Sequence, residues 1–211
     1  METVEVLPTK LYKFKLTKET HNHVLNLCDQ IDWDRFDHRW HNVPSFGKSS
    51  PGSASSHTKP IWKPIVDEIE DAARQVKETE KINMVSNFKV CGLWANRSLT
   101  NEWHHRHSHG WSFLSCICYI KGTNSGRTWF SRRNEYASRD PFPTMTEESE
   151  NLDLIYKHEP EEGSLLIFPS ILEHSVEGFK GDVRYTVSAN LFADGMSGDP
   201  STLRWAHLEV K

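Results

Sequence analysis

Four histidines within six positions lead into a long apolar segment. His104, His105, His107 and His109 precede Phe113–Lys121, in which almost every residue is apolar. Such a run is typical of a strand that is buried on both faces. A His-x-His pair at the start of a strand places both imidazoles on one face, because side chains alternate with period two. The segment therefore predicts a buried strand that begins with a pair of histidines able to bind a metal.

A third histidine and an arginine follow at the next strands. His174 comes shortly after the apolar stretch 164–168, and Arg184 stands ten residues beyond it. On a neighbouring strand, His174 can complete a facial three-ligand metal site with open positions for substrate. Arg184 shares a strand face with Thr186, and a buried strand does not normally place a guanidinium inward without an anion to meet it. We therefore expect an anionic co-substrate beside the metal.

Composition narrows the class of protein. The 211 residues carry a net charge of −4, which gives no reason to expect a nucleic-acid or bilayer partner. The sequence has no apolar run long enough for a membrane span, and its acidic first residues do not resemble a secretory signal. The four cysteines lack disulfide or zinc spacing, so we expect them to be reduced and the protein to be cytoplasmic.

The order of predicted elements defines the fold class. They are a strand over 10–16, helices over 19–31 and from Pro60 or Pro64 to about 77, and strands over 85–96, 113–121, 127–131, 152–158, 164–168, 173–176 and 183–192. Two N-terminal helices followed by about eight strands predict a mainly β protein, with helices packed on a double-sheet jelly roll. We expect a single domain over 1–211, with helical support at about 17–80 and the jelly-roll core at about 82–193.

Periodicity also predicts which side chains share a face. Ile61 should join the buried stripe of the second helix, and Trp94 should lie on the same side of its strand as Phe88 and Val90. Two polar segments, 45–57 and 132–151, are too long for simple connections. Each is either a plain linker or a lid over the site.

The motifs together resemble the Fe(II)/2-oxoglutarate-dependent oxygenases, in particular the prolyl 4-hydroxylase-like branch and its microbial and phage members whose motif reads His-x-His. The residues that carry the resemblance lie between about 85 and 192, in a characteristic order. They are Trp94-Ala95-Asn96, His107-Ser108-His109, Phe113-Leu114-Ser115, Tyr119, Ser125-Gly126-Arg127, Phe168-Pro169-Ser170, His174 and Arg184-x-Thr186. The family's fold is a double-stranded β-helix, which agrees with the jelly roll predicted from the strand pattern.

The resemblance implies an Fe(II) site. His107 and His174 match the two histidine ligands, and His109 stands where most of the family has a carboxylate. An imidazole there leaves the site one unit more positive, although imidazole remains a suitable iron ligand. His105 and His107 form a second His-x-His on the same face, so His105 stays open as an alternative to His109.

The resemblance also implies 2-oxoglutarate as co-substrate. Arg184 matches the residue that holds the far carboxylate, and a planar two-pronged donor suits that task. Tyr119 matches a tyrosine that hydrogen-bonds the same carboxylate, and Thr186 a hydroxyl that assists. Tyr119 could instead be a core residue, and Thr186 an ordinary strand residue.

Three functions fit these features. The first is an oxygenase that converts 2-oxoglutarate to succinate and CO2 while oxidising a substrate. The second is a cupin-type metalloprotein, but cupins need a glutamate where this chain has Phe113 and Leu114 (Trp111 and Ser112 if the register shifts). The third is a non-catalytic jelly-roll binding module, which leaves Arg184 without a role. The prime substrate, a peptide or small molecule, is not defined by the sequence.

Overall fold

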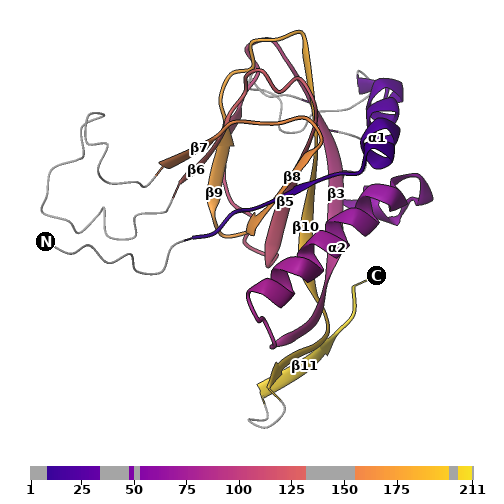
Figure 1. The fold of residues 1–211 in the computed structure, drawn as a ribbon, viewed down its shortest axis with the longest axis vertical. Coiled ribbons are helices and arrows are strands. Elements are labelled where there is room, and N and C mark those ends of the chain that lie inside the picture. The colour runs from indigo at the N-terminus through magenta and orange to yellow at the C-terminus, as the bar shows by residue number, and fades with distance from the viewer. Residues whose placement is uncertain (1–8, 34–47, 50–52, 132–154, 200–203, 211) are drawn as a thin grey trace, which may run out of the picture.

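The strands of the chain form two antiparallel sheets that face one another (Figure 1). The computed structural model describes residues 9–33, 48–49, 53–131, 155–199 and 204–210. The strands are β1 (Tyr12–Lys15), β2 (Lys48–Ser49), β3 (Val85–Leu99), β4 (His104–His107), β5 (Leu114–Lys121), β6 (Thr128–Ser131), β7 (Ile155–His158), β8 (Ser164–Pro169), β9 (Glu173–Val176), β10 (Val183–Asp199) and β11 (Arg204–Leu208). The larger sheet has the order β1-β8-β5-β10-β3-β2, with β11 paired to β10, and the smaller sheet has the order β4-β9-β6-β7.

Strand β5 is the centre of the larger sheet. It pairs with β8 on one side and β10 on the other, and seven of its eight residues are buried. Its even-numbered residues, Cys116 among them, belong to the core beneath the helices. Ile117 and Tyr119 instead join a second cluster with Phe130 and Phe168, between the two sheets. The period-two alternation therefore divides one apolar strand between two cores, as expected of a strand buried on both faces.

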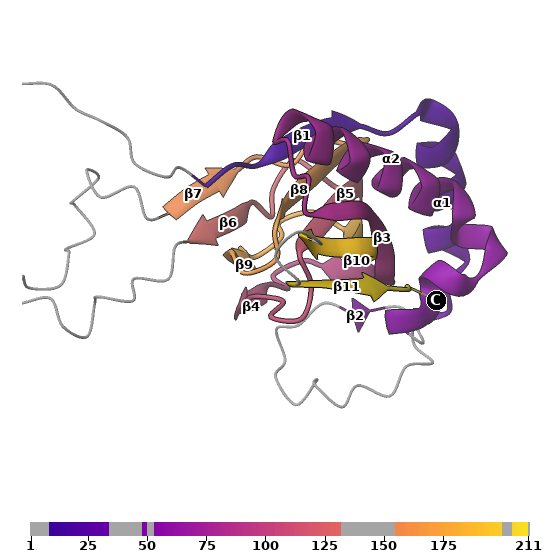
Figure 2. The same ribbon diagram turned by 90° about the horizontal axis from the view of Figure 1, so that it is seen from below.

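Two helices cover the outer face of the larger sheet (Figure 2). Helix α1 (Lys18–Gln30) begins behind Thr17, whose Oγ1 accepts a hydrogen bond from the Thr20 amide at 3.2 Å. The same hydroxyl donates a hydrogen bond to the Glu68 carboxylate of helix α2 (Lys63–Thr79). This contact joins the start of α1 to α2. Both helices were predicted from their apolar periodicity, and Thr17 is the N-cap of α1.

The buried stripe of α2 is shorter than the sequence predicts. Ile65 and Ile69 are fully buried, but Ile61 is half exposed. Ile61 lies in the short 3-10 helix η3 (Pro60–Trp62), and α2 begins only after it, with Pro64 in its first turn. A 3-10 turn has three residues per turn instead of 3.6, so the helical period does not carry across the junction.

A bulge in β3 changes the predicted face of Trp94. The pairing of β3 with β10 shifts between Asn190 and Leu191, which are opposite Gly92 and Val90. The extra residue moves the following side chains to the other face. Leu93 therefore packs under the helices, whereas the Trp94 ring lies beside His109, and the prediction that Trp94 continues the face of Val90 is wrong.

Other differences lie in short or irregular segments. The sequence pattern does not predict β4, β11 or the extension of β10 to Asp199. The segment 45–57 was expected to be irregular, but 48–49 pair with β3 as β2, and the 3-10 helix η2 spans Ser53–Thr58. The rest of that segment, and the whole of 132–151, lie outside the described residues.

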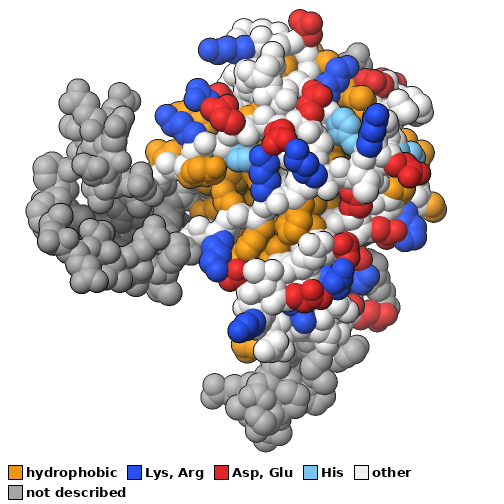
Figure 3. Space-filling view, in the orientation of Figure 1, with side chains coloured by type: hydrophobic (Ala, Val, Ile, Leu, Met, Phe, Trp, Pro, Cys, Tyr) orange, Lys and Arg blue, Asp and Glu red, His pale blue; other side chains and the backbone are white. Residues whose placement is uncertain are grey.

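The fold class is confirmed: a mainly β protein with two facing antiparallel sheets and N-terminal helices, the double-stranded β-helix arrangement. None of the helices in the described ranges is long and apolar enough to cross a membrane. Figure 3 shows positive and negative side chains interspersed over the face that α2 and β1 present. Several are paired there, as in Lys13 with Glu161 at 2.6 Å.

Two glycines with positive φ differ in the space around them: Gly122 follows β5 and Gly163 precedes β8. Comparing them tests how closely the turn after β5 packs against β10. Gly122 has φ +75°, and a Cβ there would lie 2.4 Å from the Val183 carbonyl oxygen and 2.9 Å from Arg184 Cα. Gly163 has φ +73°, and a Cβ there would meet nothing within 4 Å. Gly163→Ala should lower the free energy of unfolding by about 1–2 kcal/mol from backbone strain alone. Gly122→Ala should cost distinctly more in urea unfolding, and equal losses would contradict this packing.

Candidate metal centre and co-substrate site

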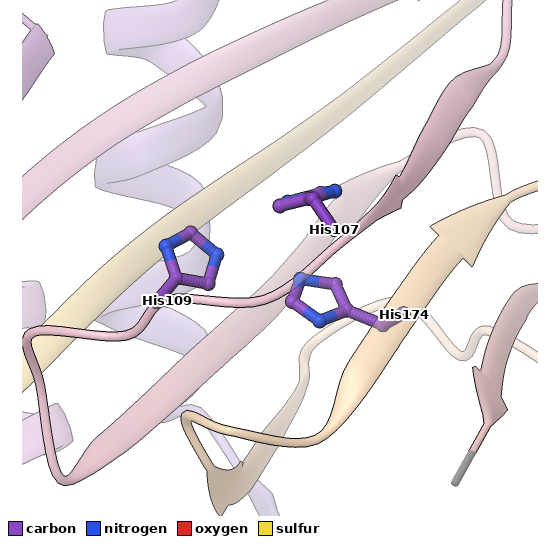
Figure 4. A group of neighbouring side chains, drawn as sticks. All are labelled: His107, His109 and His174. Carbon is purple, nitrogen blue, oxygen red and sulfur yellow. The ribbon is translucent and has the colours of Figure 1, made fainter. Parts of the chain in front are cut away.

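Three histidines from three segments meet at one end of the smaller sheet (Figure 4). His107 ends β4, His109 lies in the loop before β5, and His174 lies in β9. One ring nitrogen of each lies within 4.8 Å of the other two. The ring centroids of His107 and His174, which are paired across β4 and β9, are 4.3 Å apart. Nitrogen donors at these separations could hold one metal ion.

The histidines of the His-x-His motif come together through a loop and not through strand alternation. β4 ends at His107, so the expectation that the pair opens a strand is wrong. The amide of His109 donates to the Ser170 carbonyl at 2.9 Å, and the Ser170 amide donates to the Phe113 carbonyl at 3.1 Å. The turn between β8 and β9 therefore fixes the backbone of His109. The rings of His107 and His109 still meet, at a centroid distance of 5.1 Å.

Nδ1 of each clustered histidine already has a partner. Nδ1 of His107 donates to the His105 carbonyl at 2.9 Å, and Nδ1 of His174 donates to the Leu172 carbonyl at 3.1 Å. Nδ1 of His109 lies 3.2 Å from the side-chain amide of Asn190. The carbonyl partners hold the rings of His107 and His174 and leave Nε2 of each as the nitrogen for a metal.

Burial keeps these imidazoles neutral. It lowers the pKa of His109 to about 4 and that of His174 to about 3, with the neighbouring histidines contributing in the same direction. Burial also lowers the pKa of His107. Since a metal binds the deprotonated ring, the three side chains are in the ligand form at neutral pH.

His105, the alternative ligand, lies outside this cluster. Its side chain is exposed, and its ring centroid is 5.3 Å from that of His107. Of the two alternatives left open by the sequence, the structure groups His109, and not His105, with His107 and His174.

A buried arginine lies on the inner face of the larger sheet. Arg184 is only 2% exposed, and its Nε has no hydrogen-bond partner. No carboxylate in the described part of the chain pairs with it, and its guanidinium carbon lies 5.7 Å from the centre of the Tyr119 ring. Burial lowers the pKa of Arg184. A buried cation with an unused donor fits an anionic ligand, because leaving such a group unpaired is costly.

Tyr119 and Thr186 lie beside the arginine. They are opposite one another in the pairing of β5 with β10. The Tyr119 hydroxyl is hydrogen-bonded to Thr128 at 2.7 Å, and burial raises the pKa of Tyr119 to about 12, so the hydroxyl is neutral. Asn96 approaches the Thr186 hydroxyl at 3.5 Å. The three predicted co-substrate residues are thus neighbours on one sheet face.

Several residues around these groups were not predicted from the sequence. Thr128 holds the Tyr119 hydroxyl, and His158, whose buried Nε2 has no hydrogen-bond partner, lies 5.7 Å from the Tyr119 ring between centroids. Asn190 contacts His109. Strand alternation alone placed Asn190 on the face of Arg184 and could have indicated it. The sequence gives no such signal for Thr128 in β6 or His158 in β7, because the long segment 132–154 separates these two strands in the sequence.

Four tryptophans near the histidine cluster in the sequence or in the sheets occupy different places in the structure. The Trp94 ring lies 5.8 Å from that of His109. Trp111 is 94% exposed, close in sequence to His109, and Trp103 is 37% exposed. Trp129 donates to Glu177 at 3.1 Å. Trp94 therefore contacts the histidine cluster, and Trp129 has a structural role on the smaller sheet.

Comparison with known proteins agrees with this geometry. Residues 92–190 match the family described as "Putative 2OG-Fe(II) oxygenase", a range that includes all six predicted site residues. No curated protein is similar enough to the chain to count as a match. The matched segment carries the histidine cluster and the buried arginine, and the matching family implies Fe(II) and 2-oxoglutarate.

Solved structures show the same fold at low identity. A Pseudomonas putida prolyl-4-hydroxylase is 12% identical, with a TM-score of 0.58 over 89% of this chain and 94% of that one. The α-ketoglutarate-dependent epimerase SnoN from nogalamycin biosynthesis is 10% identical, with a TM-score of 0.66 over 90% and 82%. HygX from Streptomyces hygroscopicus is 10% identical, with a TM-score of 0.58 over 96% and 92%. Identities this low establish the fold alone.

The lowered histidine pKa values predict how stability depends on pH in the metal-free protein. The unfolded chain, with histidine pKa near 6.5, binds protons that folded His109 and His174 do not. The contribution of these two histidines to the free energy of unfolding should therefore be fully present above about pH 6.5 and decrease as the pH drops toward 4. Urea unfolding at several pH values should show a shallower loss in His174→Gln. Exposed His105→Gln is the control, and an equal slope in wild type and His174→Gln would contradict the assignment.

Proposed function

We propose that this oxygenase holds Fe(II) with His107, His109 and His174, and binds 2-oxoglutarate through Arg184, Tyr119 and Thr186. The observation that carries the proposal is the buried Arg184, with an unpartnered Nε, in a sheet whose inner face also reaches the three-histidine cluster. A domain with only one of these features would fit a plain metal protein or a plain anion-binding module. Their combination fits a metal that works beside an anionic co-substrate.

The side chains have separable tasks. Bound Fe(II) with 2-oxoglutarate supplies the oxidising chemistry, in which 2-oxoglutarate is converted to succinate and CO2. The three neutral imidazoles provide nitrogen donors whose Nδ1 atoms are already held, so the rings need little reordering. Arg184 meets the far carboxylate with two parallel donors, and Tyr119 adds a neutral hydroxyl. Thr186, which is opposite Tyr119 in the pairing of β5 with β10, would assist with its hydroxyl.

The site environment supports this arrangement. Tyr119, Thr128 and Phe168 are fully buried, so water is largely excluded around Arg184. An ion pair is stronger where water is excluded. We propose that the 211 residues work as one oxygenase domain. The four cysteines, free in the structure, support a cytoplasmic location.

For the prime substrate, we propose a peptide or a small molecule. The similar structures include a prolyl-4-hydroxylase, and HygX with hygromycin B bound, so the shared fold accommodates both classes. The test is succinate release from 2-oxoglutarate in the presence of Fe(II), with a panel of proline-containing peptides, nucleotides and free amino acids. Release stimulated by one class identifies it. Absence of both 2-oxoglutarate binding and turnover would overturn the oxygenase assignment.

Removing a ligand should remove the metal. His174→Ala and His107→Ala should each lose most bound Fe(II), because two remaining nitrogens hold a labile ion poorly. Metal content after anaerobic loading and gel filtration measures this. His109→Ala should match them, whereas His105→Ala should retain about one equivalent, since that side chain is exposed. Full iron content in both His107→Ala and His174→Ala would refute the site.

Arg184 should govern co-substrate affinity and not metal content. Losing one partner of a buried charge pair costs about 2–5 kcal/mol, so Arg184→Ala should weaken 2-oxoglutarate binding at least tens-fold. Arg184→Lys should recover only part of the affinity, because an ammonium cannot form two parallel bonds to a carboxylate. Calorimetric titration of the metal-loaded protein measures both.

A surface arginine provides the matched control. Arg127 is paired with Glu177 at 2.8 Å at the edge of β6, so Arg127→Ala should bind 2-oxoglutarate like the wild type. If Arg184→Ala also kept wild-type affinity, the anion would bind elsewhere and this part of the proposal would fail.

A further inference from the structure

The side-chain amide of Asn190 is placed to decide which nitrogen of His109 carries the proton. Asn190 lies in β10, on the face that also carries Arg184 and Thr186, because residues 185, 187, 189 and 191 pack under the helices. Its Nδ2 lies 3.2 Å from Nδ1 of His109, and its Oδ1 lies 2.9 Å from the Ser115 hydroxyl. The other two clustered histidines rely on backbone carbonyls at Nδ1. His109 alone among the three relies on a side chain.

A chain of serines continues from the amide. The Ser115 hydroxyl lies 2.9 Å from that of Ser170, which lies 2.8 Å from that of Ser112. The Ser112 hydroxyl in turn approaches the backbone carbonyl of His109 at 3.4 Å. Ser115 and Ser170 are buried, so the chain is shielded from water. The contacts form a closed path from the His109 ring to its own carbonyl.

The two orientations of the amide have opposite consequences. A rotation of 180° about the Cβ–Cγ bond exchanges its oxygen and nitrogen, and the hydrogen-bond pattern decides between them. With the nitrogen toward Nδ1, the neutral ring carries its proton on Nε2 and cannot offer that atom to a metal. With the oxygen toward the ring, Nδ1 carries the proton and Nε2 has a free lone pair.

Counting protons favours the second orientation. Each serine hydroxyl has one proton to donate. If Nδ2 donates to Ser115, then Ser115 donates to Ser170, Ser170 to Ser112, and Ser112 to the His109 carbonyl, and every contact is used. If Oδ1 instead accepts from Ser115, the three hydroxyls donate in the opposite direction. Ser112 then donates to Ser170, Ser170 to Ser115, and Ser115 to Asn190. The contact from Ser112 to the carbonyl at 3.4 Å then has no hydroxyl proton.

We propose that Asn190 is a positioning residue that turns its oxygen to His109, fixes the Nδ1–H tautomer and so presents Nε2 to the metal. The inference rests on His109 being a ligand in the proposed function. It gives a physical reason why an imidazole can stand where most of the family has a carboxylate. A carboxylate needs no choice of tautomer, whereas a neutral imidazole does, and a partner at Nδ1 also makes it a more basic ligand.

The test reads the tautomer directly and does not depend on turnover. Nitrogen-15 and proton NMR of the metal-free protein at pH 8 reports the protonated nitrogen of His109, whose signals are assigned by comparison with His109→Gln. The wild type should show the Nδ1–H form. Asn190→Asp, whose carboxylate can only accept, should keep it, and Asn190→Leu should shift His109 toward the Nε2–H form. Asn96→Leu, another buried amide in the neighbouring strand, should leave the His109 signals unchanged.

Zn2+ affinity provides the second readout. Asn190→Leu should bind Zn2+ about 10–100-fold more weakly than the wild type, as for loss of other partners behind a ligating histidine. Asn190→Asp should bind at least as tightly as the wild type. A wild-type protein in the Nε2–H form, or an Asn190→Leu variant with unchanged tautomer and affinity, would overturn the proposal.

Two further outcomes keep the test decisive. If Asn190→Leu does not fold by circular dichroism, Asn190→Asp decides alone, and a tenfold loss of Zn2+ affinity in it would refute the positioning role. If neither 2-oxoglutarate binding nor turnover is found but the tautomer follows residue 190, the oxygenase proposal fails while the role of Asn190 stands.

Discussion

The complete burial of β5 between β8 and β10 is the constraint on which the site depends. A central strand with two apolar faces needs a layer on each side, and the helices supply one while the smaller sheet supplies the other. Once β5 is held in this way, its alternate residues must face the smaller sheet. That face carries Tyr119 and Ser115, the first beside Arg184 and the second in the hydrogen-bonded chain that reaches His109. The scaffold and the chemistry therefore share one strand.

The charge balance of the site follows from this burial. In the proposed site, three imidazoles kept neutral by their surroundings add no negative charge, so Fe(II) bound there would retain its full charge. Arg184 adds another buried cation to the inner face. Two positive centres in a region of low polarity favour a doubly charged anion that can reach both. A dicarboxylate such as 2-oxoglutarate satisfies that requirement.

Sequence periodicity worked where one rule held along a whole element. It predicted both helices, the alternation of β10 that turns Arg184 and Thr186 inward, and the double burial of β5, and these are confirmed. It failed where the period changed within an element. The bulge opposite Asn190 moved Trp94 to the site face, and the 3-10 turn removed Ile61 from the helix stripe. Inserting one residue into a strand changes the local free energy little, so the preferences of the neighbouring residues do not predict the bulge.

The sequence by itself determined the family, the residue types of the metal centre and the pairing of a histidine cluster with an inward arginine, because these depend on local order and spacing. Only the tertiary structure decided that His109, and not His105, lies against His174. The loop that carries His109 is fixed by hydrogen bonds to Ser170 and approached by Asn190, both distant in the sequence. Contacts across such separations arise from how the two sheets face each other, and neither periodicity nor composition contains that information.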